Sequence, residues 1–291
     1  MSTAYEALNN TADDSQPITT TRVGRDHDSS VAGAQPPGFA GTAQGPIGKM
    51  ARKGYDICLR LNEDEIVPSD VEESFLALAS TIRPSVAQTD KRVILVTSSV
   101  RGEGKSFIAL NLSASLARMS MPTLLIDADL RVPASYEVVF PPNQHGLLTY
   151  LEGRADFSDC LFSTSVPGLS IVPSGGVSRA PLQHFASARM KDFVANIQAS
   201  ARDHCILIDS PPGLSVPEVR LFRDFVDASL IVVAANRTPR AVVGKTLELL
   251  KDIPTLGLVM NRYKPPHSAE SYYSHQSPTC DDDLSTDGLH S

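Results

Sequence analysis

The chain has 291 residues, 42% of them hydrophobic, which is enough for one large domain or two small ones with a sizeable core. Its net charge of −7 does not suggest a nucleic-acid-binding protein, and no apolar run approaches the about 20 residues of a membrane span. The N-terminal stretch MSTAYEALNN lacks the basic and apolar regions of a secretory signal, and the four cysteines have no paired spacing. We therefore expect a cytoplasmic chain with reduced thiols, without a zinc site or a disulfide framework.

Composition divides the chain into three parts. Residues 1–67 are rich in Ser, Thr, Gly, Pro, Asp and Gln without usable periodicity, so we expect a disordered N-terminal segment. Residues 265–291 have a similar composition and end with several aspartates, which predicts a disordered acidic tail. Residues 68–264 remain for a single folded domain.

Apolar runs alternate with amphipathic stretches through residues 68–264. Strands are predicted at 92–98, 122–129, 168–175, 205–210, 228–235 and 256–261. Helices are predicted at 105–119, 185–201, 215–225 and 238–251. Continuous apolar strands are typical of a parallel sheet covered on both faces, and the alternation implies right-handed β-α-β crossovers. The predicted fold class is α/β, with three layers, a mostly parallel sheet and helices on both faces.

The stretch SSVRGEGKS, residues 98–106, lies between the first predicted strand and its helix. Gly104, Lys105 and Ser106 match the end of the P-loop template, although Ser99 stands where its first glycine is expected. Backbone N–H groups of such a loop curl around a β-phosphate, and the positive end of the following helix points at that phosphate. The lysine supplies a mobile charge for the phosphate oxygens, and the serine hydroxyl can reach Mg²⁺. Strand, loop and helix together predict a P-loop NTPase site rather than an ordinary turn.

Two further predicted strands end in aspartates. LLIDADLRVP ends its strand at Asp127 and Asp129, and ILIDSPPG ends its strand at Asp209. Ligands of open parallel sheets bind outside the carboxyl ends of the strands, so we expect these carboxylates to face the loop. A single acidic strand end could cap a helix, but two of them beside a Gly-Lys-Ser loop indicate a Mg-nucleotide site. Arg131 follows within reach of a phosphate or an acidic partner, or lies on the surface.

The stretches TSSVRGEGKS, LLIDADLRVP and ILIDSPPG together resemble the three Walker motifs of the bacterial tyrosine kinases. These kinases are the cytoplasmic ATPase modules of capsular and exopolysaccharide assembly systems. Similarity extends to GLLTYLEG (146–153) and to residues 168–190, so the resemblance covers about residues 72–262. The related partition and division-site ATPases open the loop with a second lysine, where this chain has Val100, which favours the kinase-like branch.

The resemblance implies a P-loop kinase/ATPase domain that uses ATP and Mg²⁺. By motif, the expected catalytic residues are Lys105, Asp127, Asp129 and Asp209. The same resemblance implies that Ser106, Asp127 and Asp209 bind the metal. It also makes Asp127 the candidate base that accepts the proton of a tyrosine hydroxyl. The expected ATP contacts are Arg101, Gly102, Glu103, Gly104, Lys105, Ser106, Phe107 and Asn261. Arg101 stands where the kinases commonly have proline, and its guanidinium could face the nucleotide, a neighbouring subunit's phosphate or solvent.

Two features depart from the family pattern. The helix before the first strand usually carries Glu-x-x-Arg-x-x-Arg, a self-assembly element, but here Glu73 is followed by Leu76 and Ala79. The missing arginines leave a ring of the usual kind in doubt. Family tails often hold a tyrosine cluster that neighbouring subunits phosphorylate, and this tail offers Tyr272 and Tyr273. They are candidate phosphoacceptors or two tyrosines without a role.

Three functions remain open at this point. The leading hypothesis is an ATP-dependent protein-tyrosine autokinase that regulates exopolysaccharide or capsule biosynthesis and export. A second hypothesis is an ATPase switch whose nucleotide state controls docking on a membrane partner. A third, a module that holds nucleotide without chemistry, fits the intact motifs least. The resemblance implies an inner-membrane polysaccharide co-polymerase or activator protein as partner, and a peripheral location at that membrane through the partner. We expect no nucleic acid as a partner. A homo-oligomer of this chain stays an open alternative.

Overall fold

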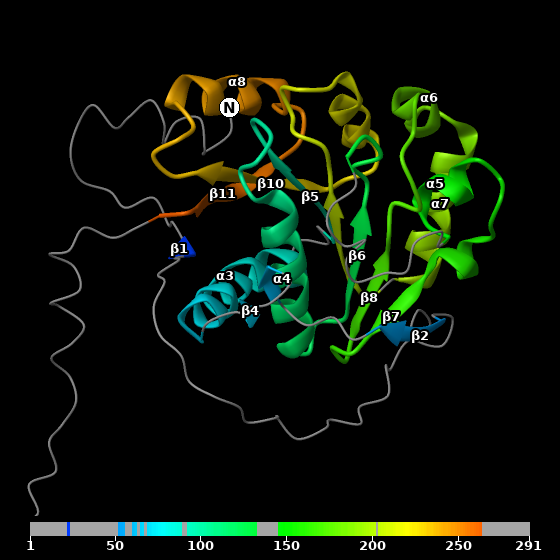
Figure 1. Cartoon of the computed structure of the whole chain (residues 1–291), viewed down its shortest axis with the longest axis horizontal. Helices are drawn as coiled ribbons and strands as arrows, with labels where there is room; N and C mark the ends of the chain where they lie inside the picture. Colours follow the sequence, from blue (N-terminus) through cyan, green and yellow to red (C-terminus); the bar gives the residue numbers. More distant parts are fainter. Residues whose placement is uncertain are drawn as a thin grey trace, which may run out of the picture.

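The computed structural model describes residues 69–88, 92–132, 145–201 and 203–263, together with four short strands nearer the N-terminus (Figure 1). These strands are β1 (Arg22–Val23), β2 (Arg52–Tyr55), β3 (Arg60–Asn62) and β4 (Glu65–Ile66). Apart from them, the segments 1–67 and 265–291 lie outside the described residues, as does the tyrosine pair at 272–273. Their disorder stays a prediction.

A nine-stranded sheet forms the centre of the domain, in the order β1-β11-β10-β5-β9-β6-β8-β7-β2. The strands not yet introduced are β5 (Val93–Ser98), β6 (Thr123–Asp127), β7 (Phe162–Thr164), β8 (Leu169–Val172), β9 (Cys205–Asp209), β10 (Ala228–Ala234) and β11 (Thr255–Asn261). Neighbouring strands of this sheet are parallel except β7 and β8, which are antiparallel. The predicted mostly parallel sheet is confirmed.

The central strands are apolar throughout because both faces of the sheet are covered. Every residue of β5, β6, β9 and β10 is buried. In β5, Val93 and Leu95 pack into one hydrophobic core, while Ile94 and Val96 pack into the other. Successive side chains of a strand point to opposite faces, so a strand that serves two cores reads as a continuous apolar run.

Helices cover the two faces of the sheet. On one face α3 (Ser69–Gln88) and α4 (Lys105–Arg118) lie side by side (Figure 1). The other face carries α5 (Leu147–Leu151), η2 (Phe157–Cys160), α6 (Pro181–Phe185), α7 (Ala188–Ser200), η3 (Pro217–Asp224) and α8 (Arg240–Leu249). The predicted three-layer α/β architecture is confirmed. None of the described helices has the length and apolar character needed to cross a bilayer.

Two predicted helices differ from the observed elements. The helix predicted at 185–201 is α7, which begins three residues later because Ser187 caps it by accepting a hydrogen bond from the Met190 N–H, and Phe185 instead ends the separate short helix α6. The helix predicted at 215–225 is the 3₁₀ helix η3, which begins at Pro217. The short elements α5, η2 and β7 were not predicted, since runs of three to five residues carry too little periodicity.

Candidate nucleotide site

The phosphate loop, residues 98–106, makes its sharp turns at glycines. Gly102 and Gly104 have φ angles of 82° and 91°, in the left-handed region that favours glycine. Ser99 does not have a positive φ, and its buried hydroxyl accepts a hydrogen bond from the Thr246 hydroxyl of α8 at 2.8 Å. Position 99 therefore needs no glycine, and its serine attaches the start of the loop to α8.

Gly104 lies directly against Asn261, the last residue of β11. A Cβ atom at Gly104 would lie 2.0 Å from Nδ2 of Asn261, far inside contact distance. The Asn261 amide donates a hydrogen bond to the backbone carbonyl of Glu103 at 2.8 Å. Asn261, expected to contact ATP, thus lies beside the loop and supports its backbone.

The Glu103 carboxylate points into the protein and is 1% exposed. It accepts hydrogen bonds from the Val100 N–H at 2.7 Å, from the Ala234 N–H at 3.2 Å, and from the Thr238 hydroxyl. Ala234 ends β10, so this carboxylate ties the phosphate loop to the neighbouring strand. The Glu103 carboxylate and its backbone carbonyl both have partners within the protein, which leaves the backbone N–H for the expected contact with a nucleotide.

Replacing Glu103 by alanine is expected to lower the free energy of unfolding by about 3 kcal/mol, because three partly or fully buried donors lose their acceptor. Glu103→Gln keeps the size of the side chain and one acceptor oxygen, so its loss should be much smaller. Urea unfolding of both variants, followed by circular dichroism, measures the difference. Equal losses in the two variants would contradict this role of the carboxylate.

The four predicted catalytic residues lie together at the carboxyl ends of the strands. Asp127 and Asp209 are register partners at the ends of the adjacent strands β6 and β9. The ammonium nitrogen of Lys105 lies 3.1 Å from Oδ2 of Asp129 and 3.8 Å from Oδ1 of Asp209. It also donates a hydrogen bond to the Ser106 hydroxyl at 3.3 Å. The three carboxylates are almost fully buried, and Lys105 supplies the positive charge that pairs with two of them.

The loop that follows β6 is ordered by its own aspartates. The N–H of Asp129 donates to Oδ1 of Asp127 at 3.1 Å. In turn Oδ1 of Asp129 accepts hydrogen bonds from the N–H groups of Arg131 at 3.3 Å and Val132 at 3.1 Å. The Asp-x-Asp pattern therefore fixes its own turn and leaves Oδ2 of Asp129 to Lys105.

Burial and neighbouring charges shift the protonation of this cluster. Burial, followed by the Asp209 carboxylate, raises the pKa of Asp127 well above its usual range. Burial opposes the charged form of Lys105, but the nearby carboxylates of Asp209 and Asp129 outweigh it, and the pKa of Lys105 is raised. At neutral pH the lysine is charged, and Asp127 accepts a proton more readily than an exposed carboxylate.

Asp127→Asn is expected to make the nucleotide-free protein more stable at pH 7, by about 1 kcal/mol. The folded state raises the pKa of Asp127, so stability is lost as the pH rises from the unfolded pKa through the folded one, whereas the amide does not ionise. The gain should vanish as the pH falls below about 3.9, the ordinary pKa of Asp. The midpoints of urea unfolding, measured from neutral pH down to below this pKa, give the gain in stability. Asp156→Asn, at an exposed position, is the matched control. A gain that does not change with pH would contradict this origin.

Arg101 and Phe107 lie on either side of the Gly-Lys-Ser core of the loop. Arg101 is exposed. The ring of Phe107 meets Phe75 of α3 edge to face, with centroids 5.5 Å apart and planes at 68°. Phe107 therefore packs α4 against α3, and Arg101 is the one of the two that solvent or a ligand can reach freely.

An ion pair connects the loops that follow the two aspartate strands. Arg131, after β6, donates through Nε and Nη2 to the two carboxylate oxygens of Glu218 in η3. The Glu218 side chain is fully buried, whereas that of Arg131 is 44% exposed. Arg131 thus has the acidic partner that was one of its predicted alternatives. Sequence analysis missed Glu218, whose only signal is a single acidic residue in SVPEV.

The residues expected to bind a metal offer a hydroxyl oxygen on Ser106 and carboxylate oxygens on Asp127 and Asp209. Magnesium in nucleotide sites takes few protein ligands and completes its shell with water and phosphate oxygens. Within the described ranges, no group of three or more His, Cys, Asp or Glu side chains could hold an ion alone. The donor set therefore fits Mg²⁺ that binds together with a nucleotide.

Comparison with known proteins places these motifs in a family. The model of the CobQ/CobB/MinD/ParA nucleotide binding domain matches residues 94–284. The tyrosine-protein kinase YwqD of Bacillus subtilis is 30% identical over 200 residues, 66% of this chain and 84% of that protein. The succinoglycan biosynthesis transport protein ExoP of Rhizobium meliloti is 33% identical over 182 residues, 61% of this chain and 23% of that protein. The crystal structure of the VpsO kinase domain matches with a TM-score of 0.59 at 31% identity, over 67% of this chain and 98% of that chain.

The matched region contains the structural core of the site. The family model spans the phosphate loop, both aspartate strands and Asn261. The solved kinase domain is covered almost entirely by this chain, so the likeness includes the fold and not only the motifs. The chain belongs to the CobQ/CobB/MinD/ParA nucleotide-binding domain family, in the branch that contains the bacterial tyrosine kinases.

Proposed function

We propose that this chain is an ATP-dependent protein-tyrosine kinase that phosphorylates its own C-terminal tail. The observation that carries the proposal is the grouping of Lys105 with Asp127, Asp129 and Asp209 beside the phosphate loop. Phosphoryl transfer depends on positioning and charge stabilisation, and these side chains supply both. The tyrosine kinase among the chain's relatives supports the same activity.

The phosphates of ATP would lie in the loop at the start of α4. Backbone N–H groups at residues 102–106 and the positive end of α4 would hold the β-phosphate. Lys105, which pairs with Asp129 and Asp209, would turn to the β- and γ-oxygens. Bound Mg²⁺ would supply further positive charge, with Ser106, Asp127 and Asp209 as its protein ligands.

The transfer step uses Asp127 as proton acceptor. A tyrosine oxygen bonds to the γ-phosphorus, the bond from that phosphorus to the β,γ-bridging oxygen breaks, and ADP leaves. The phenolic proton passes to Asp127, whose burial favours the protonated carboxyl. Asp209, its register partner, is the neighbouring negative charge that adds to this preference.

We propose that the kinase regulates exopolysaccharide or capsule biosynthesis and export. It would work in the cytoplasm, at the inner membrane, through a polysaccharide co-polymerase or activator protein. The similarity to a succinoglycan biosynthesis transport protein supports this setting.

A second candidate is an ATPase switch that controls docking on the membrane partner without transferring phosphate to tyrosine. The helix α3 favours it, because the positions expected to hold the self-assembly arginines are Leu76 and Ala79. Leu76 is half-buried and Ala79 is fully buried, so both pack within the domain. A homo-oligomer of this chain would therefore need other contacts than the family's arginine element.

Replacing Tyr272 and Tyr273 together by phenylalanine is expected to lower autophosphorylation on tyrosine at least about tenfold while ATP binding persists, because the fold and the loop are unchanged. Tyr263→Phe, nearer the domain, is the matched control and should keep the signal. Phosphotyrosine immunoblots and nucleotide titrations of the three proteins measure both properties. Undiminished phosphotyrosine in the double variant would remove the tail pair from the mechanism.

A further inference from the structure

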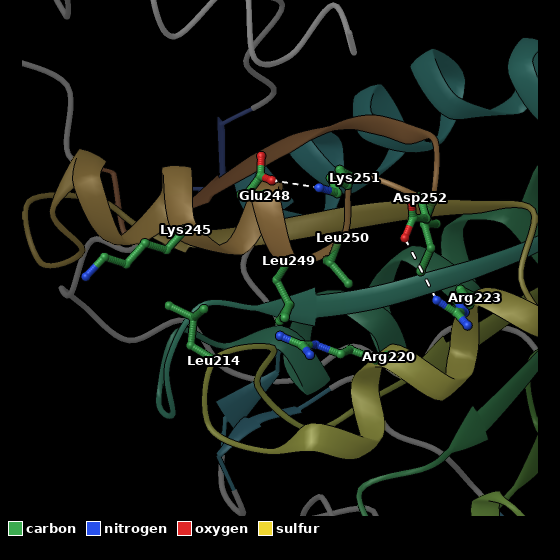
Figure 2. A pocket seen from close by; sticks show the side chains of 10 residues that line it. Leu214, Arg220, Arg223, Lys245, Glu248, Leu249, Leu250, Lys251 and Asp252 are labelled. Carbon is green, nitrogen blue, oxygen red and sulfur yellow. Dashed lines mark hydrogen bonds and ion pairs between the residues drawn. The ribbon is translucent and has the colours of Figure 1, made fainter.

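A pocket of about 520 Å³ lies between η3 and α8, and none of its lining residues belongs to the phosphate loop (Figure 2). Four basic, two acidic and four aliphatic side chains line it. The pocket therefore offers an excess of positive charge next to apolar surface. The proposed phosphoryl transfer does not use these cations.

The positive charge of the pocket is only partly compensated from within. Two of its cations are in ion pairs with its own acids, Lys251 with Glu248 at 3.0 Å and Arg223 with Asp252 at 4.0 Å (Figure 2). Arg220 and Lys245, both exposed, have no acidic partner among the described residues. Two cations thus remain for a ligand.

Aliphatic side chains lie beside the uncompensated arginine. Figure 2 shows Leu249 extending from α8 toward Arg220, with Leu214 next to them. Leu214 is 38% exposed, although it is a large hydrophobic residue. A ligand that fits this surface carries negative charges with an apolar group between or beside them.

We propose that the acidic tail of the same chain, residues 281–287, docks in this pocket. The tail has the sequence DDDLSTD, which places Leu284 between Asp283 and Asp287, and residues 265–291 contain no lysine or arginine. Its aspartates would pair with Arg220 and Lys245, and its leucine would cover the exposed aliphatic surface. The negative charge of the tail matches the two remaining cations of the pocket, and its leucine matches the exposed aliphatic surface.

The length of the chain allows this docking. Asp281 follows Tyr263, the last described residue, by 18 positions, which can span up to about 60 Å. A compact domain of about 195 residues has a radius of gyration of about 16 Å, so a linker of this length can reach a pocket on its surface. Exposed ion pairs are weak individually, but attachment to the same chain gives the tail a high effective concentration.

Docking would also restrain the segment that carries the tyrosine pair. Tyr272 and Tyr273 lie between the end of β11 and the aspartates, so both ends of their segment would be fixed. The docking itself does not depend on the proposed kinase activity. It can be measured without nucleotide.

Distances between two spin labels on the full-length chain test the proposal. One label sits on Cys280, next to the aspartates, and the other on Ser215→Cys, an exposed position beside Leu214. Cys58 is replaced by serine, and Cys160 and Cys205 are buried. Pulsed electron paramagnetic resonance at low salt should show a narrow distribution at a short distance between the two labels. High salt should reduce the population at this distance, because it screens the ion pairs.

Arg220→Glu with Lys245→Glu is expected to reduce the short-distance population about fivefold or more. Arg83→Glu with Lys191→Glu, two exposed cations elsewhere, changes the net charge equally and should leave it unchanged. Changing residues 281–283 to lysine in the charge-reversed protein should restore it. A broad distribution in the natural protein, or no response to the pocket reversal, would overturn the proposal. A short distance that vanishes on dilution with unlabelled protein would also overturn it, in favour of docking between two copies.

Discussion

Lys105→Ala is expected to abolish measurable ATP binding at micromolar concentrations and to lower tyrosine phosphorylation by about 10³-fold. The lysine would contact the phosphate oxygens on which charge develops, and the described residues offer no second lysine in the loop, where Val100 takes that position. Nucleotide titration calorimetry and a phosphotyrosine assay measure the two losses.

The same substitution also changes the protein when no nucleotide is added, because it removes the cation that pairs with Asp129 and Asp209. We therefore expect Lys105→Ala to be less stable as well, which makes a second variant necessary. Lys105→Arg keeps the charge near the carboxylates and should preserve stability, yet its larger planar head should not fit the phosphate position. Normal ATP binding by Lys105→Ala would contradict the assignment of the loop.

Arg131→Ala is expected to lower the free energy of unfolding by about 3 kcal/mol, because it leaves the fully buried Glu218 carboxylate without its partner. The arginine is partly exposed, which places the loss at the lower end for a broken buried pair. The ion pair joins the loops after β6 and β9, which carry the aspartates, so activity should fall along with stability.

A double-mutant cycle separates these contributions. Glu218→Gln removes the buried charge, so adding Arg131→Ala to that background should cost much less than in the natural protein. Urea unfolding of the four proteins gives the coupling energy. Additive losses would show that the pair is not coupled, and would contradict its role as the connection between the loops.

The sequence allowed the fold class and the grouping of the candidate site residues to be predicted, because both depend on local patterns. Apolar runs of five to seven residues identified β5, β6, β9 and β10, since each is buried on both faces. The carboxyl ends of parallel strands share one edge of the sheet, so the sequence alone predicts that Asp127, Asp209 and Lys105 lie together.

The contacts that hold the site could not be predicted in the same way, because they join residues far apart in the chain. The hydrogen bond between the Ser99 and Thr246 hydroxyls depends on the packing of α8 against the loop. The hydrogen bond from the Ala234 N–H to the Glu103 carboxylate depends in the same way on the packing of β10. Glu218 pairs with a residue 87 positions away. Neither periodicity nor motif spacing carries such information.

Incubation of the full-length chain with ATP labelled on its γ-phosphate, with and without candidate membrane partners, tests the kinase assignment most directly. We predict label on tyrosine in the natural protein, and none in Lys105→Ala. Mass spectrometry of the labelled peptide should locate it at Tyr272 or Tyr273. Hydrolysis of ATP without any phosphotyrosine, in the presence and absence of the partner, would contradict the kinase assignment and leave the ATPase switch.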